Sequence, residues 1–210
     1  FLESAWATLE HGGYGRVRDD AARIGVFAGV MWDDYGLLGL EQAALGNHVP
    51  TGSDHASIAN RISYVMNLRG PSLTVSTACS SSLLAVHLAV ESLRRGECAM
   101  AIAGGVNLSI HPSKYTRLCQ LQMLAPDGRC RSFGAGGKGY VPGEGVGAVL
   151  LKPLSRAEAD GDTIYAVIKG SAVNHGGKTH GYTVPNPKAQ ADVIGRALER
   201  AGVHARTISY

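Results

Sequence analysis

Paired cysteines, long apolar runs and clustered charges are scarce in this sequence, and each absence argues against a class of protein. The four cysteines, at positions 79, 98, 119 and 130, have no C-x-x-C spacing and follow no secretory signal, so we expect no disulfide framework and no metal site. No apolar run approaches the ~18 residues of a membrane-spanning helix. Charged residues make up only 18% of the chain, and the net charge of +3 is scattered along it. We therefore expect no nucleic-acid partner, no membrane and a reducing, cytoplasmic location.

The composition is typical of a tightly packed globular fold. The 210 residues are 45% apolar and include 28 glycines. A chain of this length can bury a well-formed core in one domain, or can form a large part of a bigger one.

Strand-like and helix-like segments alternate along the chain. Apolar runs predict strands at Ile24–Val30, Leu73–Val75, Met100–Val106, Val146–Leu151 and Thr163–Val173, with another beginning at Ile208–Tyr210. Periodicity and capping residues predict helices at Phe1–Glu10, from Ser53 or Asp54 through Val65, from Cys79 to Gly96, within Lys114–Leu124, at Ser155–Asp160 and at Lys188–Ala201. Residues 33 to 53 are expected to be irregular helix and loop. The alternation indicates a layered α/β fold with mainly parallel strands.

Cys79 stands where the pattern changes from strand to helix. The run before it is β-rich, and the apolar residues after it recur at helical spacing, at Leu83, Val86, Val90 and Leu93. At the start of a helix, unpaired N–H groups and the helix dipole favour a thiolate. The same N–H groups can hold the oxyanion that forms when a thiolate attacks an acyl carbonyl. From the pattern alone, a nucleophile and a buried structural cysteine are equally compatible with this position.

The segment Thr77–Leu83, T-A-C-S-S-S-L, resembles the nucleophile motif of β-ketoacyl synthases, the condensing domains of polyketide and fatty acid synthases. Further segments resemble other blocks of that family, in the family's order: Ala59–Tyr64, Arg69–Ser72, Asp127–Phe133, Gly139–Gly145 and Leu151–Leu154. The run Gly170–Pro187 is most similar to ketosynthases of bacterial modular polyketide synthases that lack built-in acyltransferases. Ser76 departs from the modular pattern, which usually has Asp there, and is similar to the fatty acid branch.

The resemblance implies a thiolase-like fold with α-β-α-β-α layers and two similar halves, each holding a five-stranded sheet. Residues 1–210 would then be a partial ketosynthase domain. Residues from about 1 to 155 would form the N-terminal half without its first strand, which we expect to be central in the sheet. Residues from about 160 to 210 would form the start of the C-terminal half.

The resemblance also implies a reaction and its participants. Cys79 would take an acyl chain from the phosphopantetheine arm of an acyl carrier protein, with its own backbone N–H as an oxyanion donor. A malonyl thioester on a second carrier would then lose carbon dioxide and condense with the acyl group. No bound cofactor is expected, and the family implies a homodimer. Met123 is a candidate for lining the acyl tunnel, and His175 and His180 are candidates for contacting substrate, with ordinary packing or loop roles as alternatives.

Decarboxylation in this family uses two histidines, in an H-G-T-G-T and a later N-x-x-x-H motif. None of the eight histidines occupies the family's context for either motif. We therefore expect the isolated chain to be inactive in condensation, to be part of a longer gene product and to be poorly soluble alone. Three alternatives remain: a domain that only transfers acyl chains, a hydrolase that pairs Cys79 with His175 or His180, and a non-catalytic chain-length-factor partner, which the presence of Cys79 disfavours.

Overall fold

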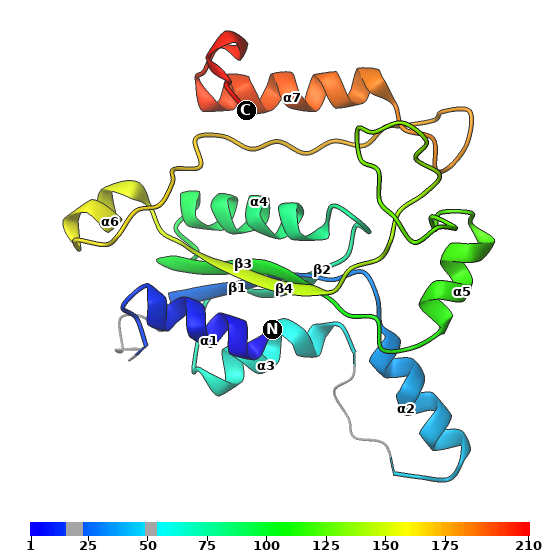
Figure 1. Cartoon of the computed structure of the whole chain (residues 1–210). Coiled ribbons are helices and arrows are strands. Elements are labelled where there is room, and N and C mark those ends of the chain that lie inside the picture. The colour runs from blue at the N-terminus through cyan, green and yellow to red at the C-terminus, as the bar shows by residue number, and fades with distance from the viewer. Residues whose placement is uncertain (16–22, 49–53) are drawn as a thin grey trace. The chain divides into compact units, whose positions relative to one another are not determined.

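The computed structural model describes residues 1–15, 23–48 and 54–210 (Figure 1). The chain divides into two compact units, Phe1–Lys152 and Pro153–Tyr210. The first unit contains the strands of the described part of the chain, together with the helices α1 to α5, and the second contains α6 and α7.

A four-stranded sheet forms the centre of the first unit, in the order β2-β1-β3-β4. Its strands are β1 (Ile24–Gly29), β2 (Ser72–Val75), β3 (Met100–Asn107) and β4 (Gly145–Leu151). β1 lies parallel to both β2 and β3, whereas β4 runs antiparallel to β3. These four strands and their mainly parallel arrangement confirm the prediction from the alternating pattern.

The expectation that this sheet lacks a central strand is wrong. β1 and β3 pair directly from Ile24 opposite Met100 to Gly29 opposite Gly105, so no place is vacant between them. The pattern of apolar runs identifies strands, but their order in a sheet is set by long-range pairing that the pattern does not encode.

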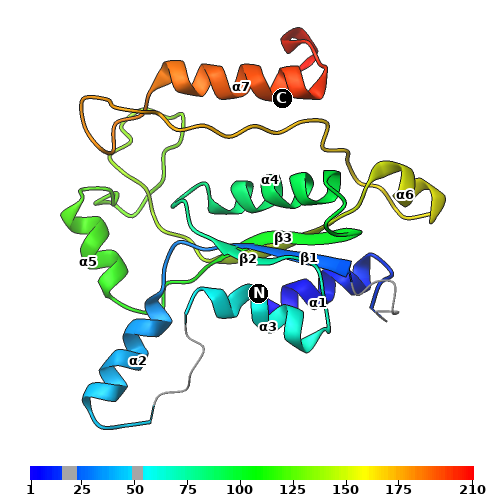
Figure 2. The ribbon, with the colours of Figure 1, turned by 180° about the vertical axis from the view of Figure 1, so that it is seen from behind.

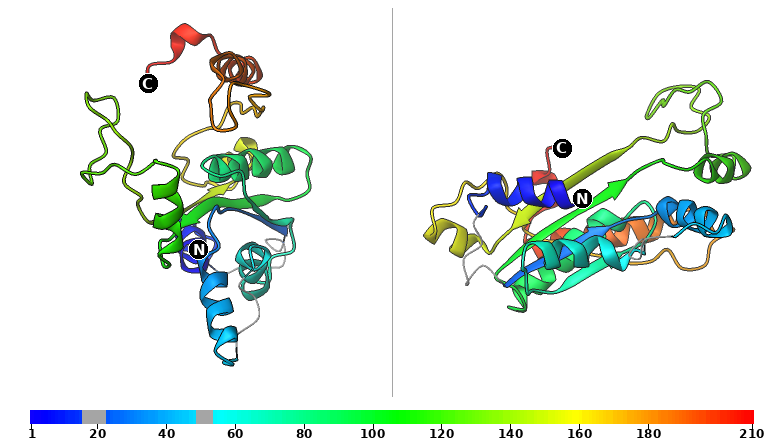
Figure 3. Two further views of the ribbon diagram at one scale, coloured as in Figure 1. Left: turned by 90° about the vertical axis from the view of Figure 1, so that its right-hand side faces the viewer. Right: turned by 90° about the horizontal axis from the view of Figure 1, so that it is seen from below.

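Helices cover both faces of this sheet. α4 (Ser81–Arg94) lies on one face, and α1 (Leu2–His11) and α3 (Ala56–Val65) lie on the other, as the front, back and side views show (Figures 1, 2 and 3). Successive strand residues face opposite sides, so Val26 joins the core under α1 and α3 while Phe27 joins the core under α4. The α4 side is built from small residues, namely Ala85 and Ala89 of the helix and Ala101 and Ala103 of β3. These small side chains let α4 lie close to the strands.

One helix differs from what the sequence indicates, and two agree with it. Residues 33 to 53 were expected to be irregular, yet α2 (Asp34–Ala44) is a regular helix, so the cost of Gly36 and Gly39, about 1 kcal/mol each, does not break it. α3 (Ala56–Val65) begins just after Asp54, whose Oδ1 accepts the Ser57 N–H of its first turn at 2.9 Å. The other candidate cap, Ser53, lies outside the described residues. The predicted helix within Lys114–Leu124 is α5 (Ser113–Gln120).

The second unit consists of α6 (Leu154–Ala159), α7 (Pro187–Ala201), a 3-10 turn at Ala205–Thr207 and extended segments. Asn186 caps α7 by accepting two backbone N–H groups, and Gly202, at φ 62°, ends it. The strands predicted at Thr163–Val173 and Ile208–Tyr210 are wrong, because neither segment pairs with a strand in the described part of the chain. A β-rich sequence favours extended backbone, but a strand also needs a neighbour to accept its hydrogen bonds.

Candidate active site

Cys79 lies in the turn between β2 and α4, as predicted. α4 begins at Ser81 with Ser80 as its N-cap, so Cys79 precedes the cap by one residue and is exposed. Ala78, just before it, has φ 55°, in the left-handed region that costs a non-glycine residue about 1–2 kcal/mol. A strained residue beside a reactive group is typical of a site whose surroundings fix the backbone.

Two serine hydroxyls fix this turn. Ser81 Oγ accepts the Thr77 N–H at 2.9 Å and donates to the Ala78 carbonyl at 2.6 Å, and the side chain is buried. Ser80 Oγ donates to the Thr77 carbonyl at 2.9 Å. Sequence reasoning predicted only a small, polar first turn here and missed that Ser81 bridges both sides of the strained residue.

Glycines let the start of α4 lie directly on the sheet. Gly29 of β1 and Gly105 of β3 are paired opposite each other beneath Ser81 and Ser82. A Cβ at Gly29 would lie 2.5 Å from the Ser82 nitrogen, and a Cβ at Gly105 would lie 3.0 Å from the Ser82 Cβ. Position 29 requires glycine for this approach and position 105 leaves little room for a larger residue, so the two strands determine where Cys79 stands.

Cys79 opens into a cavity of about 670 Å³ within the first unit, called here the Cys79 cavity. Its walls include Trp32, Val86, Lys114, Tyr140 and Val149. Within the described residues the Cys79 amide donates no hydrogen bond, so it is available to an oxyanion above the thiol. The arrangement therefore supplies a nucleophile, an N–H donor and space for an acyl group.

Lys114 is a buried cation in the wall of this cavity, with only 2% of its surface exposed. Its ammonium donates to Asn107 Oδ1 at 2.9 Å, the Leu108 carbonyl at 3.1 Å and Ser109 Oγ at 2.8 Å. Burial lowers the pKa of Lys114, and the carboxylates of Asp34 and Glu144 oppose that shift. Sequence reasoning missed this residue, because a lysine in a short helix is ordinarily exposed.

Tyr140 forms another part of the wall, and Met123 holds it there. The Tyr140 N–H donates to the Met123 carbonyl at 2.9 Å, and the Ala125 N–H donates to the Tyr140 carbonyl at 3.0 Å. Burial, and then the nearby Cys79 thiol group, raise the pKa of the Tyr140 phenol. Among the described residues, those that line the Cys79 cavity include Tyr140 but not Met123. Met123 therefore acts on the cavity through its backbone carbonyl, which binds the lining residue Tyr140.

The two predicted histidines belong to the second unit. Both are exposed, and His175 Nδ1 accepts the Gly177 N–H at 2.9 Å in a local turn. Cys79 belongs to the first unit, so a role for either histidine at the thiol stays a prediction.

The spacing N-x-x-x-H does occur once, at Asn107 to His111, and sequence reasoning passed over it. Both nitrogens of His111 are engaged: Nε2 lies 2.9 Å from Glu41 Oε1, and Nδ1 accepts the Ser113 N–H at 3.1 Å. His111 is also absent from the described lining of the Cys79 cavity. The spacing therefore serves a structural contact between α2 and the segment before α5.

The described residues contain neither a cluster of metal ligands nor a membrane-spanning helix. Outside positions 16–22 and 49–53, no three His, Cys, Asp or Glu side chains are grouped as metal ligands. In that same part of the chain, no helix combines the length and apolar character that crossing a membrane requires.

Comparison with known proteins agrees with this geometry. The family model described as "Beta-ketoacyl synthase, N-terminal domain" matches residues 1–157, and the corresponding C-terminal domain model matches residues 165–210. Polyketide synthase PksL of Bacillus subtilis is 56% identical over all of this chain, which spans 5% of PksL. Polyketide synthase ThaG of Burkholderia thailandensis is 55% identical over all of this chain, which spans 4% of ThaG.

Two solved structures also resemble this chain closely. The oxazolomycin ketosynthase domain OzmH KS7 of Streptomyces albus superimposes with a TM-score of 0.91 at 53% identity, over 98% of this chain and 37% of that one. The module 6 ketosynthase of the Bacillus subtilis bacillaene synthase gives a TM-score of 0.90 at 42% identity, over 100% of this chain and 36% of that one. These matches confirm the thiolase-like α/β fold that the sequence resemblance implied. The chain therefore belongs to the β-ketoacyl synthase family, among the ketosynthase domains of polyketide synthases.

Proposed function

We propose that this chain is part of a condensing ketosynthase domain and that Cys79 is its nucleophile. The observation that carries the proposal is the exposed thiol at a strained strand-to-helix turn, facing a cavity with its own amide unpaired in the described structure. A turn held by Ser81 and seated on Gly29 keeps that geometry rigid. Residues of about 1–155 would supply the nucleophile half and residues of about 160–210 the start of the second half.

The first half-reaction follows from this geometry. The Cys79 thiolate attacks the carbonyl of an acyl thioester carried on the phosphopantetheine arm of an acyl carrier protein, and a carbon–sulfur bond forms. The Cys79 N–H stabilises the oxyanion of the tetrahedral intermediate. The intermediate collapses, the carrier's thiolate leaves and takes up a proton, and the acyl group remains on Cys79.

The second half-reaction joins this acyl group to a malonyl unit. The malonyl thioester loses carbon dioxide, and the resulting enolate carbon attacks the acyl carbonyl and displaces the Cys79 thiolate. In the family, the two histidines of the H-G-T-G-T and N-x-x-x-H motifs assist decarboxylation, and residues 1–210 do not contain them in that context. The isolated chain is accordingly expected to be acylated but not to condense.

The partners follow from the same family membership. We propose an acyl carrier protein as donor, acyl and malonyl thioesters as substrates, no bound cofactor and a cytoplasmic polyketide assembly line of the kind without built-in acyltransferases. A homodimer would form beside the nucleophile, and β2 supports this, because the described strands pair with it on one edge only. Met123, His175 and His180 are proposed to contact the acyl chain or its carrier arm.

Acylation of the complete gene product tests the proposal. The protein is incubated with an acyl-loaded carrier protein, and the acyl group is located by mass spectrometry of proteolytic peptides. We expect the acyl mass on the peptide that contains Cys79, and a β-ketoacyl product once malonyl carrier is added. Cys79→Ala should abolish both. Release of free acid without any carrier would favour the hydrolase, and acylation without condensation would favour a transfer-only domain.

A further inference from the structure

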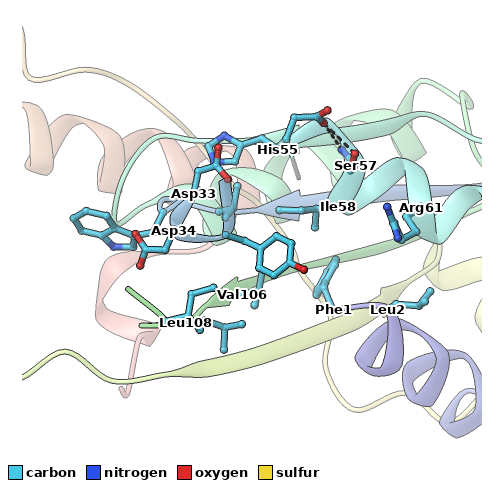
Figure 4. Close-up of a pocket in the computed structure, with 15 residues that line it drawn as sticks. Phe1, Leu2, Asp33, Asp34, His55, Ser57, Ile58, Arg61, Val106 and Leu108 are labelled. Carbon is cyan, nitrogen blue, oxygen red and sulfur yellow. Dashed lines mark hydrogen bonds between the residues drawn. The ribbon is translucent and has the colours of Figure 1, made fainter. Parts of the chain in front are cut away.

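A second cavity lies beside the Cys79 cavity in the first unit. It has a volume of about 340 Å³ and is called here the Asp34 cavity (Figure 4). Figure 4 shows Asp34 and His55 on one side of it and the apolar Ile58, Val106 and Leu108 along it. The residues Val30, Trp32 and Val106 line both cavities, so the partition between the cavities lies at these residues.

The Asp34 cavity contains polar atoms whose hydrogen bonds are unmade. Asp34 is only 5% exposed, and its Oδ2 has no hydrogen-bond partner in the described structure. The same holds for His55 Nε2. Buried polar groups are ordinarily satisfied, so these atoms are suited to bind a polar group that enters this space. The cavity is also far larger than a single bridging water requires.

Trp32 is the largest side chain of the partition, and two cations hold its ring. Lys114 Nζ lies 5.4 Å from the ring centroid, and the guanidinium carbon of Arg117 lies 5.6 Å from it. Lys114 is itself fixed by three acceptors in the segment 107–109. The ring is therefore held in a fixed position at the side of the Cys79 cavity.

We propose that Trp32 is a specificity-determining residue that confines the acyl group to the Cys79 cavity and separates it from the Asp34 cavity. This inference rests on the proposed acylation of Cys79. A smaller side chain at position 32 joins the two spaces, so the distal end of a long acyl chain can enter the second one. There the unpaired Asp34 Oδ2 accepts a hydrogen bond from a distal hydroxyl group, as found on a hydroxylated acyl chain.

The dependence of the Cys79 acylation rate on acyl-chain length tests whether Trp32 separates the two cavities. Cys79 acylation in the complete gene product is timed with hexanoyl and dodecanoyl thioesters of a small thiol, and the ratio of the two rates is compared between variants. Trp32→Ala should raise the dodecanoyl-to-hexanoyl ratio by about tenfold or more, since each methylene bound in an apolar pocket is worth roughly that factor. Trp6→Ala is the matched control, because this second tryptophan lines neither cavity.

Arg117→Met gives an independent variant, since it removes one brace without touching either cavity lining. Arg117→Met should also raise the dodecanoyl-to-hexanoyl ratio, but by a smaller factor. If Trp32→Ala does not fold, the ratio in Arg117→Met tests the inference in its place. An unchanged ratio in a folded Trp32→Ala protein, or in Arg117→Met where the first variant is unfolded, overturns the inference. Absence of Cys79 acylation with every thioester in the wild-type protein instead overturns the proposed function.

The role of Asp34 has its own test. In the Trp32→Ala protein, a 12-hydroxydodecanoyl thioester should acylate Cys79 faster than the dodecanoyl thioester, and adding Asp34→Ala should abolish that preference. A preference that persists in the double variant overturns the assignment of Asp34 as the acceptor. Equal rates for the two thioesters in Trp32→Ala overturn it as well.

Discussion

Replacing Gly29 with alanine tests whether the sheet sets the position of Cys79. The new Cβ would lie 2.5 Å from the Ser82 nitrogen, 2.6 Å from the Ser81 carbonyl carbon and 2.7 Å from the Ser82 Cα, whereas ordinary contacts are 3.4–4 Å. All three atoms are backbone, so no side chain can turn away. The first turn of α4 must withdraw by about 1 Å, which is the difference between those distances.

Two magnitudes follow from that displacement. Overpacking of this kind costs roughly 1–3 kcal/mol of unfolding free energy. A displacement of about 1 Å at the reacting group lowers a rate by roughly 100-fold. We therefore expect Gly29→Ala to lower Cys79 acylation far more than its loss of stability explains, because the folded protein itself holds the thiol in the wrong place.

Urea unfolding and acylation rates, measured on the complete gene product, separate the two effects. Gly105→Ala should be milder, since its Cβ would meet Gly29 O and Ser82 Cβ at 3.0 Å. Gly147→Ala on β4 is the matched control for stability, because its Cβ meets nothing within 4 Å. The reasoning is refuted if Gly29→Ala unfolds at the same urea concentration as wild type and acylates at the same rate.

Two further substitutions give defined outcomes. Ser81→Ala removes the hydroxyl that bridges Thr77 and Ala78 and leaves the N–H of the exposed Thr77 without that acceptor, so the unfolding free energy should fall by about 0.5–1.5 kcal/mol in urea titrations; an unchanged unfolding free energy would contradict that role. Lys114→Met tests the buried cation through pH. Burial lowers the pKa of Lys114 below its ordinary 10.5, so the unfolded chain binds that proton more tightly than the folded one. The unfolding free energy of wild type minus that of Lys114→Met should therefore rise as pH is raised toward 10.5, and a difference that is flat or falls would show the shift to have the opposite sign.

The local parts of this site could be predicted from the sequence, and the long-range parts could not. The turn at Cys79 was predictable because the change from strand to helix lies within one short segment. The burial of Lys114 was not, since Trp32, which lies against its ammonium, comes from a distant part of the chain that only the tertiary fold brings there. The strand predicted at Thr163–Val173 failed for a related reason: its residues favour extended backbone, but no described strand lies beside it.

The alanines beneath α4 have a consequence for how such an enzyme can change. Ala85 and Ala89 seat the helix on Ala101 and Ala103, and the same helix begins at the turn that carries Cys79. A larger side chain at any of these four positions would push α4 away from the sheet and so displace the thiol at its N-terminal end. The core here is therefore constrained by chemistry as well as by stability. New acyl preferences must arise in the cavity walls, where a side chain can change size while the nucleophile stays in place.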